Sequence, residues 1–150
     1  MSVPKWQRTE SKAAFIYQTY KLCIRLNEIM ANKPKKYKTN NIDRILNAAF
    51  DALKNLQIAN QIFMCEKTEE HDYLLRRKCL QLAQGDIQHV ATTSYILLET
   101  IRRHDCENSV KLYKQEMEIG NACENISRLI DGVLKSDKEL FRKHIKPQQG

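Results

Sequence analysis

The sequence predicts an all-α protein, an antiparallel up-down four-helix bundle with a short fifth helix at its C-terminal end. The chain has 150 residues, the length of one domain, with only 4 glycines and 3 prolines. A strand-rich fold needs turn residues about every ten positions, more than this composition supplies. Apolar residues instead recur at steps of three and four, as in an amphipathic helix. We expect one domain over residues 1–150, with frayed ends at about 1–8 and 145–150.

The first helix is predicted to begin at Thr9, a good N-cap residue, and to end at Lys33-Pro34, because proline disfavours helical geometry in the residue before it. Its apolar stripe consists of Phe15, Thr19, Leu22, Leu26 and Ile29. Segment 32–41 is predicted to be a loop that ends in a cap for the second helix, supplied by Thr39, Asn40 or Asn41.

The second and third helices are predicted over 42–65 and 69–103, with Thr68 as the cap between them. Asn60 and Phe63 fall on the apolar stripe of the second helix, and a buried Asn60 would need a hydrogen-bond partner. The third helix is long enough to project from the bundle. Gly85 lies inside it and is expected to mark a close helix approach or a small kink.

The fourth helix is predicted over 110–135, capped by Asn108 or Ser109. Its stripe consists of Tyr113, Met117, Gly120, Cys123, Ile126, Ile130, Val133 and Leu134. The Ser136 to Glu139 segment has the spacing of a capping box and predicts the start of the short fifth helix, which would run through Phe141.

The cysteines indicate a reducing compartment. There are five, Cys23, Cys65, Cys79, Cys106 and Cys123, and no two of them form a C-x-x-C pair. We expect them to be reduced thiols, with Cys23, Cys79 and Cys123 buried. No signal-peptide core occurs, and no apolar run reaches the ~20 residues of a membrane span. A cytoplasmic protein that makes no membrane contact is therefore expected.

The sequence contains no motif that supports catalysis or metal binding. Asp86 and His89 share a helix face at the spacing used by di-iron bundles, but such sites need a second pair and two more carboxylates. Glycine-rich phosphate loops and hydrolase motifs do not occur. We expect no catalytic residue, no metal and no cofactor. A metal-dependent enzyme at Asp86 and His89 remains the contrasting hypothesis.

Basic residues outnumber acidic ones by 25 to 18, and the formal net charge of +7 favours an anionic partner such as nucleic acid. The candidate contacts lie in the first loop and second helix, early in the third helix, and at its end. They are Lys33, Lys35, Lys36, Lys38, Arg44, Arg76, Arg77, Lys78, Arg102 and Arg103.

The predicted topology places these groups. In an up-down bundle the first loop and the end of the third helix share one pole, and the Arg76 to Lys78 group lies nearer the other. Charge spread in this way suits contact with a phosphate backbone better than readout of bases. The alternative is ordinary solvated charge with i,i+4 pairing.

Several short motifs lie at or near the predicted helix boundaries. They are Pro4-Lys5-Trp6 with Thr9, Lys33-Pro34-Lys35, Asp43-Arg44-Ile45, Ala59-Asn60, Arg77-Lys78-x-Leu80-x-x-Ala83 with Ile87, Ser109 with Tyr113, and Ile130 to Ser136. In these motifs the chain, from Trp6 to Ser136, resembles the Avd (accessory variability determinant) family of diversity-generating retroelements. It is also similar to the bundle proteins encoded in ribosomal RNA intervening sequences. Lys33 stands where the family has Phe, and Val133 where it has Trp.

The resemblance implies a non-enzymatic, pentameric protein with a basic surface. Such a protein binds the retroelement's reverse transcriptase and its template RNA or cDNA, and supports mutagenic reverse transcription. Arg44, Arg77 and Lys78 lie at matching basic positions, whereas the loop lysines are candidates from charge alone. The alternative is a structural or protein-interaction module of the intervening-sequence type, without specific RNA binding.

Overall fold

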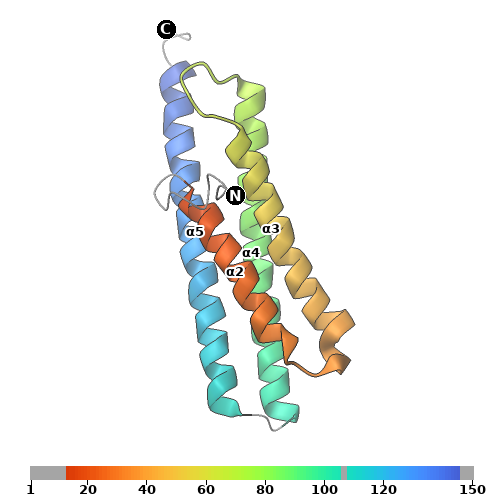
Figure 1. Ribbon diagram of the computed structural model, residues 1–150. Helices are drawn as coiled ribbons and strands as arrows, with labels where there is room; N and C mark the ends of the chain where they lie inside the picture. The colour runs from red at the N-terminus through yellow and green to blue at the C-terminus, as the bar shows by residue number, and fades with distance from the viewer. Residues whose placement is uncertain (1–12, 106–107, 146–150) are drawn as a thin grey trace, which may run out of the picture.

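Four long helices make up most of the structure, a computed structural model that describes residues 13–105 and 108–145 (Figure 1). They are α2 (Ala14–Ala31), α3 (Asp43–Gln61), α4 (Glu70–His104) and α5 (Ser109–Ile145). Successive helices run in opposite directions, which confirms the predicted up-down bundle. The predicted cap Thr9, Cys106 and the end segments 1–8 and 146–150 lie outside the described residues.

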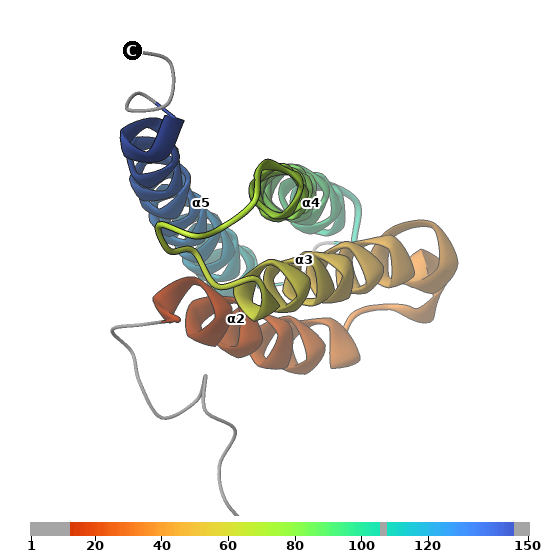
Figure 2. The ribbon, with the colours of Figure 1, turned by 90° about the horizontal axis from the view of Figure 1, so that it is seen from above.

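The helices differ in length by about a factor of two. Each packs against its neighbour in the chain, and α2 closes the ring against α5 (Figure 2). At ~1.5 Å per residue, α4 and α5 are about 52 and 55 Å long, whereas α2 and α3 are about 27 and 28 Å. As expected from its length, α4 projects past the start of α2, with α5 beside it, toward the end that carries the C-terminus.

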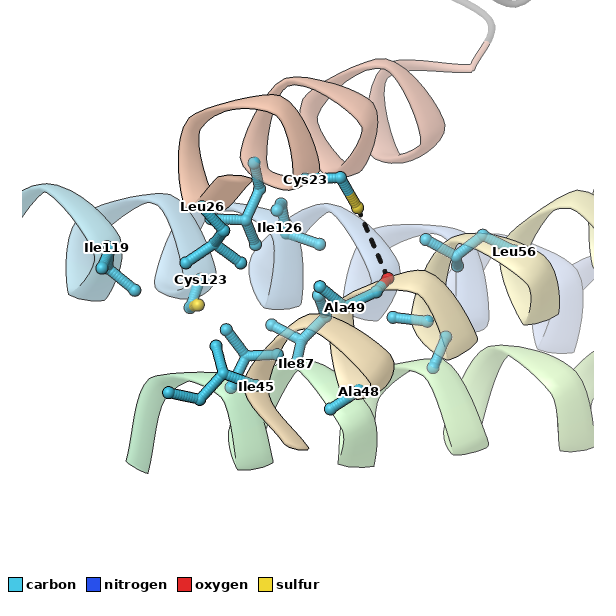
Figure 3. Packing of buried hydrophobic residues seen from close by; sticks show 14 of the residues in the cluster. Cys23, Leu26, Ile45, Ala48, Ala49, Leu56, Ile87, Ile119, Cys123 and Ile126 are labelled. Atoms are coloured by element: carbon cyan, nitrogen blue, oxygen red, sulfur yellow. Dashed lines mark hydrogen bonds between the residues drawn. The ribbon is translucent and has the colours of Figure 1, made fainter. Parts of the chain in front are cut away.

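The apolar stripes of the four helices meet in one core (Figure 3). The stripe predicted for α2 is buried throughout, and the thiol of Cys23 donates a hydrogen bond to the carbonyl oxygen of Ala49 in α3 (3.6 Å). On α5 the predicted stripe is wrong at its start. Tyr113 and Met117 are about half exposed, and Leu112 and Ile119 are buried in their place. Leu112 and Ile119 lie fourteen and seven residues before Ile126, the spacing that keeps one seam facing the neighbouring helices.

Three further packing predictions, for Asn60, Phe63 and Gly85, are wrong. Asn60 is exposed, and Phe63 lies beyond the last residue of α3, where helical periodicity no longer applies. Gly85 is also exposed, and a Cβ atom added there would meet nothing within 4 Å. It therefore marks no close helix approach.

The predicted loop before α3 is largely helical. Lys35–Tyr37 forms a 3-10 turn and Lys38–Ile42 a π-helical turn that runs directly into α3. The amide of Asp43 donates to the carbonyl of Lys38, so this helix start needs no side-chain cap. None of Thr39, Asn40 and Asn41 caps α3, contrary to the sequence prediction.

The other predicted boundaries have mixed outcomes. Asn108 does cap α5, because its Oδ1 accepts a hydrogen bond from the amide of Lys111 (3.2 Å). Thr68 does not cap α4; its hydroxyl instead accepts from the amide of Cys65 and donates to the carbonyl of Phe63 within the α3–α4 loop. Ser136 starts no separate fifth helix, because α5 continues to Ile145.

Arg76 joins three helices at the end where α4 and α5 project. Its Nε donates to Asp137 of α5 at 2.6 Å, and its Nη1 donates to the carbonyls of Ala59 and Ile62 at 3.0 and 2.9 Å. The last turn of α3 contains no basic residue, so Arg76 supplies the positive charge that a helix C-terminus favours. Beside it, the rings of Tyr73 and Phe141 stack with centroids 4.1 Å apart.

Loss of the Asp137 carboxylate is expected to destabilise the bundle strongly. The side chains of Arg76 and Asp137 are only 11% and 8% exposed. Asp137→Ala leaves the guanidinium buried without its anion, and the free energy of unfolding should fall by about 3 kcal/mol in urea denaturation. Glu124→Ala on the same helix breaks a pair with Arg128 that is about 70% exposed on both sides. That control should cost less than about 0.5 kcal/mol. Equal losses of unfolding free energy in the two variants would contradict a structural role of the Arg76–Asp137 pair.

Candidate nucleic-acid interface

Three chain segments form one pole of the bundle, here called the basic pole: residues 32–44, the end of α4 and the start of α5. Lys36 Nζ and Tyr37 Oη donate to the two carboxylate oxygens of Asp105 at 2.7 and 2.8 Å. Lys33 Nζ donates to Gln115 Oε1 of α5 at 2.7 Å. The first loop and the Arg102 end of α4 are therefore together, as the sequence predicted (Figure 1).

Asp105 is the electrostatic partner of the loop. Its hydrogen bonds from Lys36 and Tyr37 lower the pKa of its carboxyl group. The same contact raises the pKa of the Lys36 ammonium, so both groups keep their charge at neutral pH. The contact spans 68 and 69 residues of sequence and holds the lysine-rich turn against the end of α4.

Most of the excess positive charge lies on this pole. Residues 33–44 contain five basic side chains and one acidic one, Asp43, a net charge of +4 out of the chain's +7. The basic residues are Lys33, Lys35, Lys36, Lys38 and Arg44. More than half of the formal net charge therefore comes from twelve residues at this pole.

The cations of this segment differ in availability. Lys35, Lys38 and Arg44 are exposed, and none of them forms an ion pair with any described residue. Lys36 is exposed but paired with Asp105. Lys33 is half-buried and bonded to Gln115. The first three are thus the cations best placed to meet an external anion.

A hollow of about 190 Å³ opens beside Arg44. It is lined by Asn40 and Asn41 of the π-turn, Arg44 of α3, and Thr93 and Ile96 of α4. Two amides and a guanidinium beside an aliphatic side chain can bind a polar group next to the lysines. The rare π-turn itself positions the two amides, and such turns recur at functional sites.

The arginines at the end of α4 are partly neutralised. Arg102 donates to both carboxylate oxygens of Glu99 at 2.7 and 2.8 Å, and Arg103 donates to Glu99 at 3.3 Å. The Arg102 hydrogen bonds lower the pKa of Glu99. Burial, followed by the nearby charge of Glu99, raises the pKa of Glu116 on α5. Arg103 remains largely exposed, whereas Arg102 serves mainly to balance these carboxylates.

The third predicted group lies far from the basic pole. The side chain of Arg76 is largely covered, because its guanidinium donates to Asp137 and to the end of α3. Arg77 is half-buried and donates to the Tyr73 hydroxyl at 3.0 Å, and Lys78 is exposed. These residues lie on the first third of α4, nearer the opposite pole, as the topology predicted.

Asp86 and His89 do not assemble a metal site. Asp86 accepts a hydrogen bond from Asn55 at 3.3 Å, and burial raises the pKa of its carboxyl group. His89 is exposed. Across residues 13–105 and 108–145, no group of three or more His, Cys, Asp or Glu side chains is arranged to hold a metal ion.

Sequence reasoning missed several residues of the basic pole. Asp105 and Gln115 hold the loop. Asn40 and Asn41, which were predicted from the sequence only as helix caps, line the hollow. Lys111 and Lys114 add two exposed cations on one face of α5. Their i,i+3 spacing was a detectable signal. The partners of Lys33 and Lys36 were not detectable, because they are 82 and 69 residues away.

The chain matches no family model, no curated protein and no solved structure. The Avd resemblance therefore stays a prediction. Within the described part of the chain, none of the helices has an apolar stretch long enough to cross a membrane.

The four cysteines among the described residues fall into two classes. Cys23, Cys79 and Cys123 are buried and free, as predicted. Burial raises the pKa of Cys23 to about 11 and that of Cys123 to about 12. Cys65 lies in the α3–α4 loop, where hydrogen bonds from the Lys67 amide and the Thr68 hydroxyl lower its pKa.

We expect Cys65 to react before the buried thiols. Because thiolate is the nucleophile, iodoacetamide at pH 8 should alkylate Cys65 at least about ten times faster than Cys23 or Cys123. Peptide mapping by mass spectrometry reads each site separately, and the rates should converge in 8 M urea. Alkylation of Cys23 in the native protein at the rate of Cys65 would show that the core between α2 and α3 is open.

Proposed function

We propose that the chain is a non-catalytic accessory protein that binds RNA through its basic pole. The observation that carries this proposal is the net charge of +4 on residues 33–44, together with the contacts of Asp105 and Gln115 that hold this segment in place. A preorganised cationic turn contacts a polyanion without first having to be ordered, which lowers the entropic cost of binding.

Phosphate rather than base recognition fits these side chains. Lysine ammonium groups act as point charges for phosphate oxygens. Lys35, Lys38 and Arg44 form no ion pair with any described residue and follow one another from the 3-10 turn to the start of α3, which suits the repeated charge of a nucleic-acid strand. The hollow at Arg44 offers amides for one additional polar contact, such as a ribose hydroxyl or a base edge.

The more specific role comes from the Avd resemblance. It is that of an accessory protein of a diversity-generating retroelement, which assembles as a homopentamer in the cytoplasm and binds the reverse transcriptase and its template RNA or cDNA. A basic pole repeated in an oligomer would multiply the local field. The competing assignment is a structural module of the intervening-sequence type, and the two differ in RNA affinity.

Neutralising the unpaired cations should weaken RNA binding. For Lys35→Gln/Lys38→Gln/Arg44→Gln, we expect lower affinity for a structured RNA in fluorescence anisotropy. The slope of log K against log salt should become shallower by about 0.7 for each phosphate of a single strand that the variant no longer neutralises.

A matched variant controls for total charge. Lys67→Gln/Lys135→Gln/Lys138→Gln removes three exposed lysines far from the basic pole. This control should keep nearly the parental affinity and slope. If both triple variants weaken binding equally, net charge rather than the basic pole governs binding. If neither has an effect, the structural-module assignment is favoured.

Removing the carboxylate of Asp105 should act in the opposite direction. Asp105→Asn releases the Lys36 ammonium and raises the charge of the pole by one. We expect a higher RNA affinity and a salt slope steeper by about 0.7, measured in the same titration. A weaker RNA complex would show that the position of the loop matters more than its charge.

The reverse-transcriptase assignment needs its own test. Tagged full-length protein, purified from its own host, should carry a reverse transcriptase together with one discrete structured RNA. Recovery of neither with a folded oligomer would favour the structural module, even if RNA binds in vitro.

A further inference from the structure

A groove follows the seam between α2 and α5 and reaches the basic pole at the start of α5, where Lys111 and Lys114 form part of its rim. It consists of two hollows of about 440 and 270 Å³, which share Arg25 of α2 and Glu118 of α5. These two side chains form a 2.7 Å ion pair that crosses the seam. The helices lie side by side here in both views of the bundle (Figures 1 and 2).

The floor and the rim of this groove differ in chemistry. Three aliphatic residues, Leu22, Ile119 and Ala122, line the hollow of about 270 Å³. The rim carries Lys21 and Arg25 from α2, and Lys111 and Lys114 from α5, against the single carboxylate of Glu118. The charged residues lining the groove thus have a net charge of +3, and Val110 adds an exposed apolar side chain at the mouth.

We propose that this groove binds the apolar face of an acidic amphipathic helix from a partner protein. An apolar floor between cationic rims complements such a helix, whose aliphatic residues recur at i, i+3, i+4 and i+7 with carboxylates beside them. From Val110 to Ala122 the groove follows α5 for about 18 Å, the length of a helix of about 12 residues.

The ion pair across the seam can open for such a partner. Arg25 and Glu118 are each nearly half exposed, and pairs exposed to water contribute little to stability. A carboxylate of the incoming helix replaces Glu118 as the partner of Arg25. Lys111 and Lys114, both exposed, meet further carboxylates along the same face.

The lining residues favour a peptide over a nucleic acid. None of the residues lining the two hollows is aromatic, so the groove offers no stacking surface for bases. Its aliphatic floor gains nothing from a sugar-phosphate backbone but gains from burying leucine or isoleucine side chains. The proposal stands on different residues from the RNA contact, because Lys35, Lys38 and Arg44 do not line this groove.

The test uses full-length protein and a defined probe: a fluorescein-labelled helical peptide of about 14 residues with leucines at i, i+3, i+7 and i+10 and flanking glutamates. Anisotropy should show saturable binding. Lys111→Glu/Lys114→Glu should weaken it roughly tenfold or more by reversing charge on the rim. Lys135→Glu/Lys138→Glu makes the same charge change at exposed sites farther along α5 and should leave affinity nearly unchanged.

Two further titrations separate the groove from general electrostatic attraction. A peptide with glutamine in place of each leucine should bind at least about ten times more weakly, because it cannot fill the floor. Lys35→Gln/Lys38→Gln/Arg44→Gln should keep peptide affinity while losing RNA affinity. No saturable binding, equal loss in both α5 variants, or equal binding of the glutamine peptide would overturn the proposal. So would a Lys111→Glu/Lys114→Glu variant that loses RNA binding but keeps peptide binding.

Discussion

The guanidinium of Arg76 holds together the end of the bundle where the helices no longer match in length. It neutralises Asp137, bonds to two carbonyls at the end of α3, and projects from α4, so that one side chain touches three helices. Without it, the end of α3 would have no cation, and the buried Asp137 would have no counter-ion. Replacing such a centre by apolar residues would require several simultaneous changes, because removal of either partner alone leaves a buried charge.

This contact also explains why the two ends of the molecule differ. At the Arg76 end, charge is buried and paired, and the Tyr73–Phe141 stack extends the packing of α4 against α5. At the basic pole, the contacts that hold the loop, Lys36 with Asp105 and Lys33 with Gln115, are more exposed. Lys35 and Lys38 form no ion pair with the described residues. The buried ion pair thus lies at one end of the bundle, and the charge that can interact with partners lies at the other. Interaction sites commonly lie on loops positioned by a rigid scaffold.

The sequence carried enough information for the topology but not for the contacts between distant segments. Periodicity located all four helices, and the proline at position 34 correctly ended the first one. Thr68, Asn40 and Asn41 were misassigned because a polar side chain near a helix start can cap it, close a loop or line a hollow with the same local sequence. Asp137 lies inside the predicted Ser136 to Glu139 capping box, but its actual partner is Arg76, 61 residues earlier. The sequence located the basic groups along the chain. Only the tertiary contacts show that Arg76 is paired with Asp137, whereas Lys35 and Lys38 are exposed.

Local neutralisation, more than the number of basic residues, determines which surface can meet an anion. Arg102 and Arg103 share Glu99, and Arg25 is divided between Glu28 and Glu118. An arginine held by a carboxylate must give up that bond before it can bind a phosphate, whereas an unpaired lysine gives up only water. Lys38 of the π-turn and Arg44 at the start of α3 form no ion pair with any described residue, and Lys35 precedes them in the 3-10 turn. The α2–α5 groove has the opposite design: its arginine is already bound to a carboxylate, and a partner that brings carboxylates of its own can exchange one such bond for another. The two surfaces are therefore suited to different ligands, although both are basic.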